Sequence, residues 1–263
     1  MKTYIALATA MLSVAAVPVT AAELKPTIVL VHGALETSDV WGHVIAKLHQ
    51  DGFKVRNVGL PGRRGNELPM SNVSLDLYQQ TVAKAIAGEV HPVVLVGHGS
   101  GGITISAEAE AEPQKIKTLV YVAAYIPQNG DSLLKLATRD KGSKLGTILM
   151  VNKEKGFVAV PPAVGGALFA SDASPAIQRI VASGIVNEPL APLATPVTLT
   201  ADRFRRVNKV VIHTLRDEVV SPQLQTEMIS TTPIHRELMI NSGHAPFMTR
   251  PKALAADIEK AAG

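Results

Sequence analysis

The chain has 263 residues, of which 46% are hydrophobic and 18% are charged, and it contains no cysteine. These values are typical of a globular protein with one large α/β domain and argue against a disordered chain. The net charge of +4 comes from scattered lysines and arginines, and their densest cluster is interleaved with apolar residues (Arg203, Arg205, Arg206 and Lys209). This distribution does not favour nucleic-acid binding, and disulfide bonds are excluded.

Residues 1–22 have the three parts of a secretory signal peptide. Lys2 supplies the positive start, residues 4–17 form an apolar core, and residues 19–22 (VTAA) form a small-residue cleavage site. Removing them leaves a net charge of +3, and we expect the mature chain in the bacterial periplasm or the medium. Neither this apolar core nor any later stretch is long enough to span a membrane. A buried N-terminal helix is the alternative interpretation of the segment.

From residue 27 onward, short β-branched runs alternate with stretches of helical periodicity. Such alternation predicts an α/β fold, a mostly parallel sheet with helices on both faces. The expected strands are 27–31, 54–58, 92–96, 117–122, 209–214 and 236–240. The expected helices are 40–48 (capped by Asp39), 75–86, 103–111, 222–230 and one that starts at Pro251.

Between residues 126 and 204 this alternation stops. Prolines and glycines break the segment into short apolar pieces, and no good strand is evident. We expect an inserted cap over the C-terminal edge of the sheet, with a core formed by residues 23–125 and 205–263. Four apolar residues are candidates either for lining a pocket under the cap or for an ordinary core role (Leu145, Ile148, Phe157 and Phe169).

The most informative motif is the run Gly97-His98-Gly99-Ser100-Gly101-Gly102, which follows an apolar strand and precedes a helix. This context is typical of the G-x-S-x-G nucleophile elbow, but Gly99 occupies the position of the serine. Three interpretations remain open. The nucleophile of an esterase has been replaced, the turn has shifted so that Ser100 attacks, or the chain is a binding protein without catalysis. A shifted turn would place His98 where a small glycine is needed for helix–strand packing.

Two further residues complete the pattern of a serine hydrolase. Asp217 and His244 each follow a late predicted strand, so both fall at the edge where open α/β sheets place their sites. The carboxylate would orient the imidazole, which would transfer the proton. Asp131 is the reserve acid, and Asp202 is a less suitable one.

Backbone N–H groups are expected to hold the developing oxyanion. One would come from Ser100, directly after the nucleophile position, and the other from Ala34, in the loop after the first strand. His32 and His98 are expected to brace these loops. The other histidines lack metal-ligand spacing and are expected to be structural or surface residues (His43, His49, His91, His213 and His235).

Several motifs in this order carry a resemblance to a known family. They are residues 29–34 (VLVHGA), 94–102, 122–127 (VAAYIP), 217–222 and Gly243-His244. Together they resemble the α/β-hydrolase branch of plant methylesterases (salicylic acid-binding protein 2 type) and hydroxynitrile lyases, with bacterial pyrethroid-hydrolase-like carboxylesterases as relatives. The resemblance implies an α/β-hydrolase fold and a carboxylesterase with a small, largely apolar pocket, a small-molecule ester as substrate and no cofactor.

Two departures from this family bear on function. Lyases of the branch carry threonine at the position of Gly33 and lysine directly after the catalytic histidine, where this chain has Ala245. Without that cation, the resemblance favours ester hydrolysis over cyanide chemistry. The other departure is Gly99. We therefore expect hydrolysis of small hydrophobic esters, with a periplasmic binder of a small apolar ligand, or a lactonase or amidase, as alternatives.

Overall fold

The computed structural model describes residues 25–64 and 66–263, so the predicted signal peptide lies outside the described residues. Six strands form a sheet in the order β2-β1-β3-β4-β8-β9, and every neighbouring pair is parallel. The strands are β1 (Ile28–Val31), β2 (Val55–Val58), β3 (Val93–His98), β4 (Ile116–Val122), β8 (Asn208–Thr214) and β9 (Arg236–Ile240). The predicted α/β fold is confirmed.

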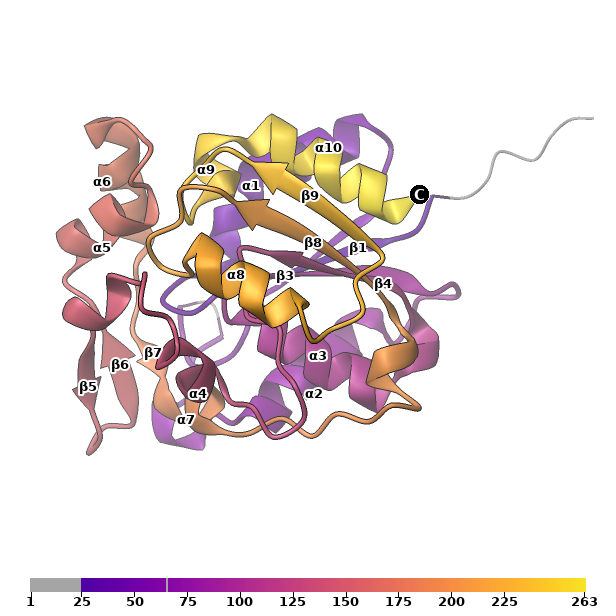
Figure 1. Cartoon of the computed structure of the whole chain (residues 1–263), viewed down its shortest axis with the longest axis horizontal. Coiled ribbons are helices and arrows are strands. Elements are labelled where there is room, and N and C mark those ends of the chain that lie inside the picture. The colour runs from indigo at the N-terminus through magenta and orange to yellow at the C-terminus, as the bar shows by residue number, and fades with distance from the viewer. Residues whose placement is uncertain (1–24, 65) are drawn as a thin grey trace, which may run out of the picture.

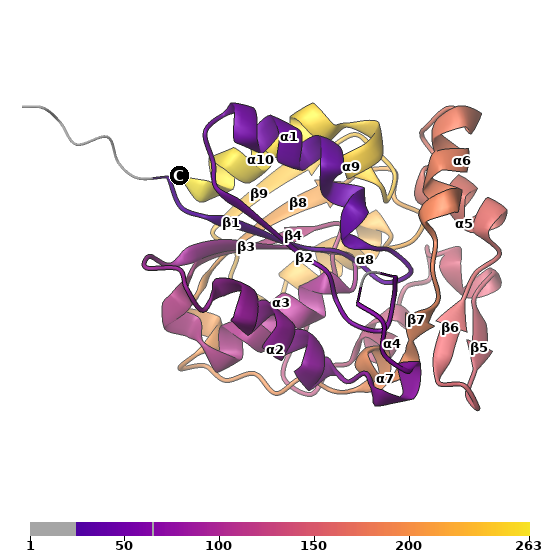
Figure 2. The same ribbon diagram turned by 180° about the vertical axis from the view of Figure 1, so that it is seen from behind.

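Helices cover both faces of this sheet (Figures 1 and 2). One face carries α1 (Gly42–Gln50), α9 (Pro246–Thr249) and α10 (Pro251–Ala262), and the other carries α2 (Leu75–Ile86), α3 (Gly101–Ala111) and α8 (Pro222–Ile229). Successive strand residues point to opposite faces, so the sheet contributes to two separate hydrophobic cores. Leu30 and Val96 pack with the first helix layer, whereas Val31 and Leu95 pack with the second.

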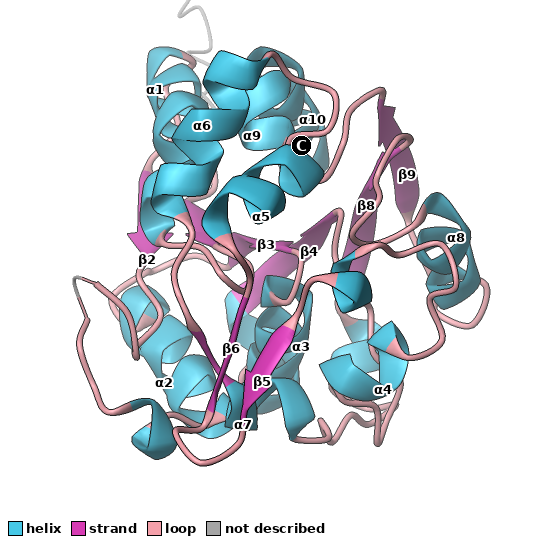
Figure 3. Ribbon diagram, turned by 90° about the vertical axis from the view of Figure 1, so that its left-hand side faces the viewer, coloured by secondary structure: helices cyan, strands magenta, loops and turns pink. Residues whose placement is uncertain are grey.

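The segment between β4 and β8 lies beyond the carboxyl ends of the strands, where Figure 3 shows it facing the viewer. It contains α4 (Leu133–Ala137), α5 (Pro162–Phe169), α6 (Pro175–Gly184), α7 (Leu190–Ala194) and the strands β5 (Met150–Asn152), β6 (Phe157–Ala159) and β7 (Glu188–Pro189). The expectation of no strand in this segment is therefore wrong. These antiparallel strands have at most three residues, too few to show a period of two in the sequence.

The predicted cap of the first helix is also wrong. Asp39 lies inside a 3-10 turn (Ser38–Trp41) and α1 begins only at Gly42, so the Asp39 side chain caps nothing and instead lies 3.6 Å from Arg64. The apolar period of α1 itself is as expected, with Val44 and Leu48 buried. Within residues 25–64 and 66–263, no helix has both the length and the apolar character needed to cross a membrane.

Candidate active site

Asp217 and His244 meet at the carboxyl end of the sheet, in the loops after β8 and β9. The Asp217 Oδ2 atom lies 2.9 Å from His244 Nδ1, and both side chains are buried. Asp217 is itself held in place, because its Oδ1 accepts hydrogen bonds from the backbone N–H groups of Val219 and Val220 at 2.8 and 2.9 Å, and its Oδ2 accepts one from Thr214 Oγ1. With Nδ1 donating to the carboxylate, His244 Nε2 remains free to accept a proton.

The turn from β3 into α3 places Gly99, not Ser100, at its tip. Gly99 has φ +52°, whereas Ser100 has ordinary helical angles (φ −65°, ψ −21°) where α3 begins. A Cβ built on Gly99 would lie 3.4 Å from His244 Nε2 and 3.7 Å from the Cα of Gly33. Among the described residues, no hydrogen bond joins Ser100 to His244. The position that faces the imidazole is therefore 99.

Two backbone N–H groups open into the same space. Ala34 and Ser100 line the cavity, and among residues 25–64 and 66–263 neither N–H finds an acceptor. Their neighbours differ, because the N–H of Gly33 donates to Glu36 and that of Leu35 donates to Glu188, each at 3.0 Å. The two free donors are thus available to a negatively charged oxygen.

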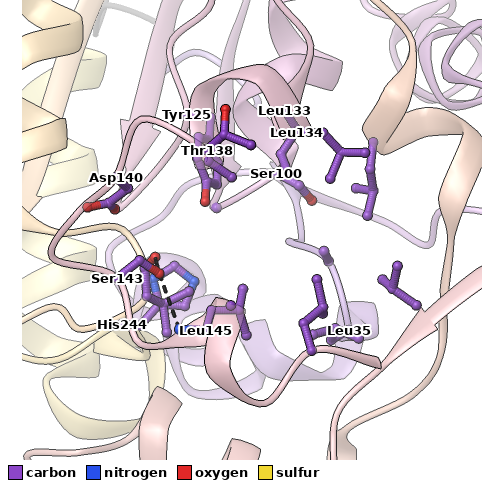
Figure 4. Close-up of a pocket in the computed structure, with 18 of the residues that line it drawn as sticks. Leu35, Ser100, Tyr125, Leu133, Leu134, Thr138, Asp140, Ser143, Leu145 and His244 are labelled. Atoms are coloured by element: carbon purple, nitrogen blue, oxygen red, sulfur yellow. Dashed lines mark hydrogen bonds between the residues drawn. The ribbon is translucent and has the colours of Figure 1, made fainter. Parts of the chain in front are cut away.

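The cavity beside Gly99 and His244 has a volume of about 290 Å³ (Figure 4). Its walls are mostly apolar and come from both the sheet loops and the segment between β4 and β8 (Leu35, Leu133, Leu134, Ala137, Leu145, Leu149, Val158, Phe169, Leu193 and Val219). Phe169 packs with its ring edge on His244, at 5.5 Å between ring centroids. Small or drug-sized apolar ligands with a few polar atoms are typical of such sites.

Few polar side chains reach this cavity. The Tyr125 hydroxyl has no hydrogen-bond partner among the described residues, and burial raises the pKa of Tyr125, so it stays a neutral donor. Asp140 is already engaged, since it accepts hydrogen bonds from the backbone N–H of Ser221 at 2.8 Å and from the Ser221 hydroxyl at 2.5 Å. Tyr125 is therefore the polar group best placed to meet a ligand away from His244.

His32 braces the loop after β1. Its Nε2 accepts a hydrogen bond from the N–H of Leu60 at 3.2 Å, and its Nδ1 lies 2.8 Å from the carbonyl of Gly33. This pattern requires a neutral ring that carries its proton on Nδ1. Burial, together with the nearby Arg63 cation, lowers the pKa of His32 to about 3. His32 is thus a neutral structural residue.

The remaining sequence candidates lie away from His244. Asp131 contacts Lys135 at 2.8 Å and accepts a hydrogen bond from the N–H of Gln128, and Asp202 lies in an exposed turn. Leu145 and Phe169 line the cavity, whereas Ile148 and Phe157 do not appear among its lining residues. Sequence reasoning missed Tyr125 and Glu36, although a lone acid in the apolar loop after β1 was a usable signal.

Metal ligands were also sought. Over the part of the chain that the structure describes, no group of three or more histidines and acids is arranged to hold a metal ion.

Comparison with known proteins places this geometry in a family. Residues 28–257 match the family described as "Alpha/beta hydrolase family". A protein named methylesterase 11, chloroplastic, from Arabidopsis thaliana is 31% identical over 246 residues, which cover 86% of this chain and 61% of that protein, so the chain spans less than two thirds of it. Methyl jasmonate esterase 1 from Vitis vinifera is 26% identical over 258 residues, covering 88% of this chain and 95% of that protein.

Solved structures show the same fold. A pyrethroid hydrolase from Sphingobium faniae superposes with a TM-score of 0.78 at 22% identity, covering 90% of this chain and 97% of that one. An extracellular alpha/beta-hydrolase from a Paenibacillus species superposes with a TM-score of 0.75 at 21% identity, covering 90% and 98%.

Proposed function

Because the chain belongs to the alpha/beta hydrolase family, we propose that it hydrolyses carboxylic esters of small hydrophobic acids or alcohols. The observation that carries the proposal is the buried Asp217–His244 pair, whose free Nε2 faces position 99 in the same cavity as two unpaired backbone N–H groups. Relatives named as esterases support the reaction class.

Water takes the part of the nucleophile in this proposal. The absent side chain at position 99 leaves space beside His244 Nε2, where a Cβ would still be 3.4 Å away. A water molecule there gives its proton to Nε2 while its oxygen bonds to the ester carbonyl carbon. The N–H groups of Ala34 and Ser100 hold the resulting oxyanion. When the intermediate collapses, the carbon–oxygen bond to the alcohol breaks and His244 returns the proton to the leaving oxygen.

This route is slow compared with that of a serine hydrolase. No acyl-enzyme forms, and removing the nucleophile from such a site costs on the order of 10⁶ in turnover. The oxyanion hole and substrate binding still leave on the order of 10³–10⁴ over the uncatalysed rate. Slow hydrolysis that depends on His244 is therefore the expected activity of the native chain.

The substrate class follows from the cavity. Its apolar walls suit small hydrophobic acyl or alcohol groups, and in this assignment residues 126–204 act as the cap that closes them off from water. The same machinery would serve a lactone or an amide. The predicted signal peptide in residues 1–22 keeps the periplasm or the medium as the proposed location.

Hydrolysis of p-nitrophenyl acetate and butyrate by four proteins tests the proposal. These are the native chain, Gly99→Ser, Ser100→Ala and His244→Ala. Gly99→Ser should gain about a thousandfold or more, because it restores a nucleophile beside Nε2. Ser100→Ala should leave the native rate nearly unchanged, because only its backbone N–H is used. His244→Ala should abolish turnover above background.

Each alternative predicts another result. Loss of activity in Ser100→Ala would make Ser100 the nucleophile. Unchanged turnover in His244→Ala would refute the assignment of the base. Tight binding of a small apolar ligand without hydrolysis, even by Gly99→Ser, would favour the binding protein.

A further inference from the structure

A second pair of buried titratable residues lies directly behind His244. The Glu36 Oε2 atom is 3.0 Å from His98 Nδ1, and the other ring nitrogen, Nε2, is 2.8 Å from the backbone carbonyl oxygen of His244. His98 is completely buried and Glu36 is 5% exposed. The rings of His98 and His244 are only 4.5 Å apart between centroids.

The hydrogen bonds determine the charge of His98. A carboxylate and a carbonyl oxygen can only accept, so both ring nitrogens must carry a proton for both contacts to be hydrogen bonds. His98 is then an imidazolium and Glu36 its counter-ion. Burial alone would lower the pKa of His98, but the Glu36 charge, its hydrogen bond and the His244 carbonyl raise the pKa of His98 above its usual value.

Glu36 also ties a third loop to this pair. The same Oε2 accepts a hydrogen bond from the N–H of Gly33 at 3.0 Å, next to the free N–H of Ala34. A Cβ at Gly33 would come within 2.9 Å of His98 Nδ1 and 3.0 Å of Glu36 Oε2, so glycine is needed for this close approach. Aromatic edges from Trp41 and Phe247 close the space around the His98 ring.

We propose that Glu36 is a positioning residue, which keeps His98 doubly protonated and thereby holds the loops of Ala34, Gly99 and His244 in register for catalysis. The loop after β1, the turn before α3 and the loop after β9 are joined through this one carboxylate and one imidazolium. The inference rests on the proposed function for its catalytic consequence, but the charge of the pair does not depend on activity.

Glu36→Gln removes the charge while keeping the size of the side chain. A neutral His98 has a single N–H, so it loses its bond either to residue 36 or to the His244 carbonyl. The matched control is Glu227→Gln, which removes an exposed carboxylate paired with Arg139. A double variant, Glu36→Gln with His98→Gln, shows whether the two residues act as one unit.

Nuclear magnetic resonance of the ¹⁵N-labelled full chain at about pH 7.5 tests the charge without any substrate. His98→Gln assigns the His98 signals among those of the other histidines. His98 should be an imidazolium in the native chain and in Glu227→Gln, and neutral in Glu36→Gln, in which the ring signals of His244 should also shift. The other titratable groups near the pair are His32, Asp217 and His244, and their signals are followed together. A neutral His98 in the native chain would overturn the proposal.

Kinetics test the positioning role in the Gly99→Ser background, where activity is expected to be measurable. Glu36→Gln should lower kcat by about 10- to 100-fold with KM nearly unchanged, because misplacing catalytic groups by about 1 Å has an effect of this size. Glu227→Gln should leave both constants unchanged, and the double variant should lose no more than the larger single loss. A rise in KM alone would contradict positioning. If Gly99→Ser itself is inactive, the proposed function fails, and the His244 signals in Glu36→Gln then decide the inference.

Discussion

At the scale of single residues, Gly99 is replaceable as far as the backbone is concerned. Two non-glycine residues of this chain adopt comparable angles, Leu35 at φ +63° and Ala123 at φ +47°. Each is held by backbone hydrogen bonds, for example from the N–H of Val186 to the carbonyl of Leu35 at 3.0 Å. A serine at 99 would cost about 1–2 kcal/mol of strain, and its Cβ would meet His244 only at ordinary contact distance. Glycine there therefore bears on the chemistry more than on the fold.

Asp217→Asn should lower kcat by on the order of 10⁴ with KM nearly unchanged. An amide at this position favours the wrong tautomer of His244, although its oxygen can still accept hydrogen bonds from Val219 and Val220. Steady-state kinetics in whichever of the native chain and Gly99→Ser is more active measure the change. Asp131→Asn is the control and should retain full activity; if that variant alone were inactive, the reserve acid would replace Asp217.

At the scale of elements, the crossing of β3, α3 and the loop after β4 positions the site. Gly97, Gly101 and Gly102 allow this contact, and a Cβ on Gly102 would lie only 2.1 Å from the carbonyl oxygen of Tyr125. The crossing brings Gly99 beside His244 and also places Tyr125 at the cavity. The glycine pattern was visible in the sequence, but the identity of the contacting carbonyl was not, because Tyr125 is distant along the chain.

Gly102→Ala should destabilise the protein by about 1–3 kcal/mol or more, because the added methyl overlaps a backbone atom that cannot rotate away. Urea unfolding followed by circular dichroism measures the difference. Gly88→Ala is the matched control, since nothing lies within 4 Å of its added Cβ, and it should change stability little. Equal stabilities of the two variants would show that the crossing is looser than described.

At the scale of the whole molecule, two hydrophobic cores enclose several buried titratable groups. His32 remains neutral in the fold with its pKa lowered to about 3, while an unfolded histidine takes up a proton near pH 6.5. Stability from this group is therefore complete above pH 6.5 and is lost as the pH falls from 6.5 towards 3. His98 has the opposite sign, because its pKa is raised and its contribution is lost as the pH rises through that value.

Relative to His32→Gln, the native chain should lose about 2–3 kcal/mol of unfolding free energy between pH 7.5 and pH 4.5. Taking the difference between the two proteins cancels the other titratable groups. Urea unfolding at both pH values gives the four free energies required. The exposed His235→Gln variant should follow the native chain. Parallel pH dependence of His32→Gln and the native chain would mean that His32 titrates normally in the fold.

The sequence by itself determined the order of strands and helices, since periodicity and breakers are local signals; the helix over 75–86 and the strand over 236–240 have the predicted bounds. It also located Asp217 and His244 at strand ends. Only the tertiary structure decided that Asp217 contacts His244, that Gly99 is the tip of the turn, and that Glu36 pairs with His98. The physical reason is separation along the chain: the bond from His98 to the His244 carbonyl spans 146 residues, and no local pattern encodes such a contact.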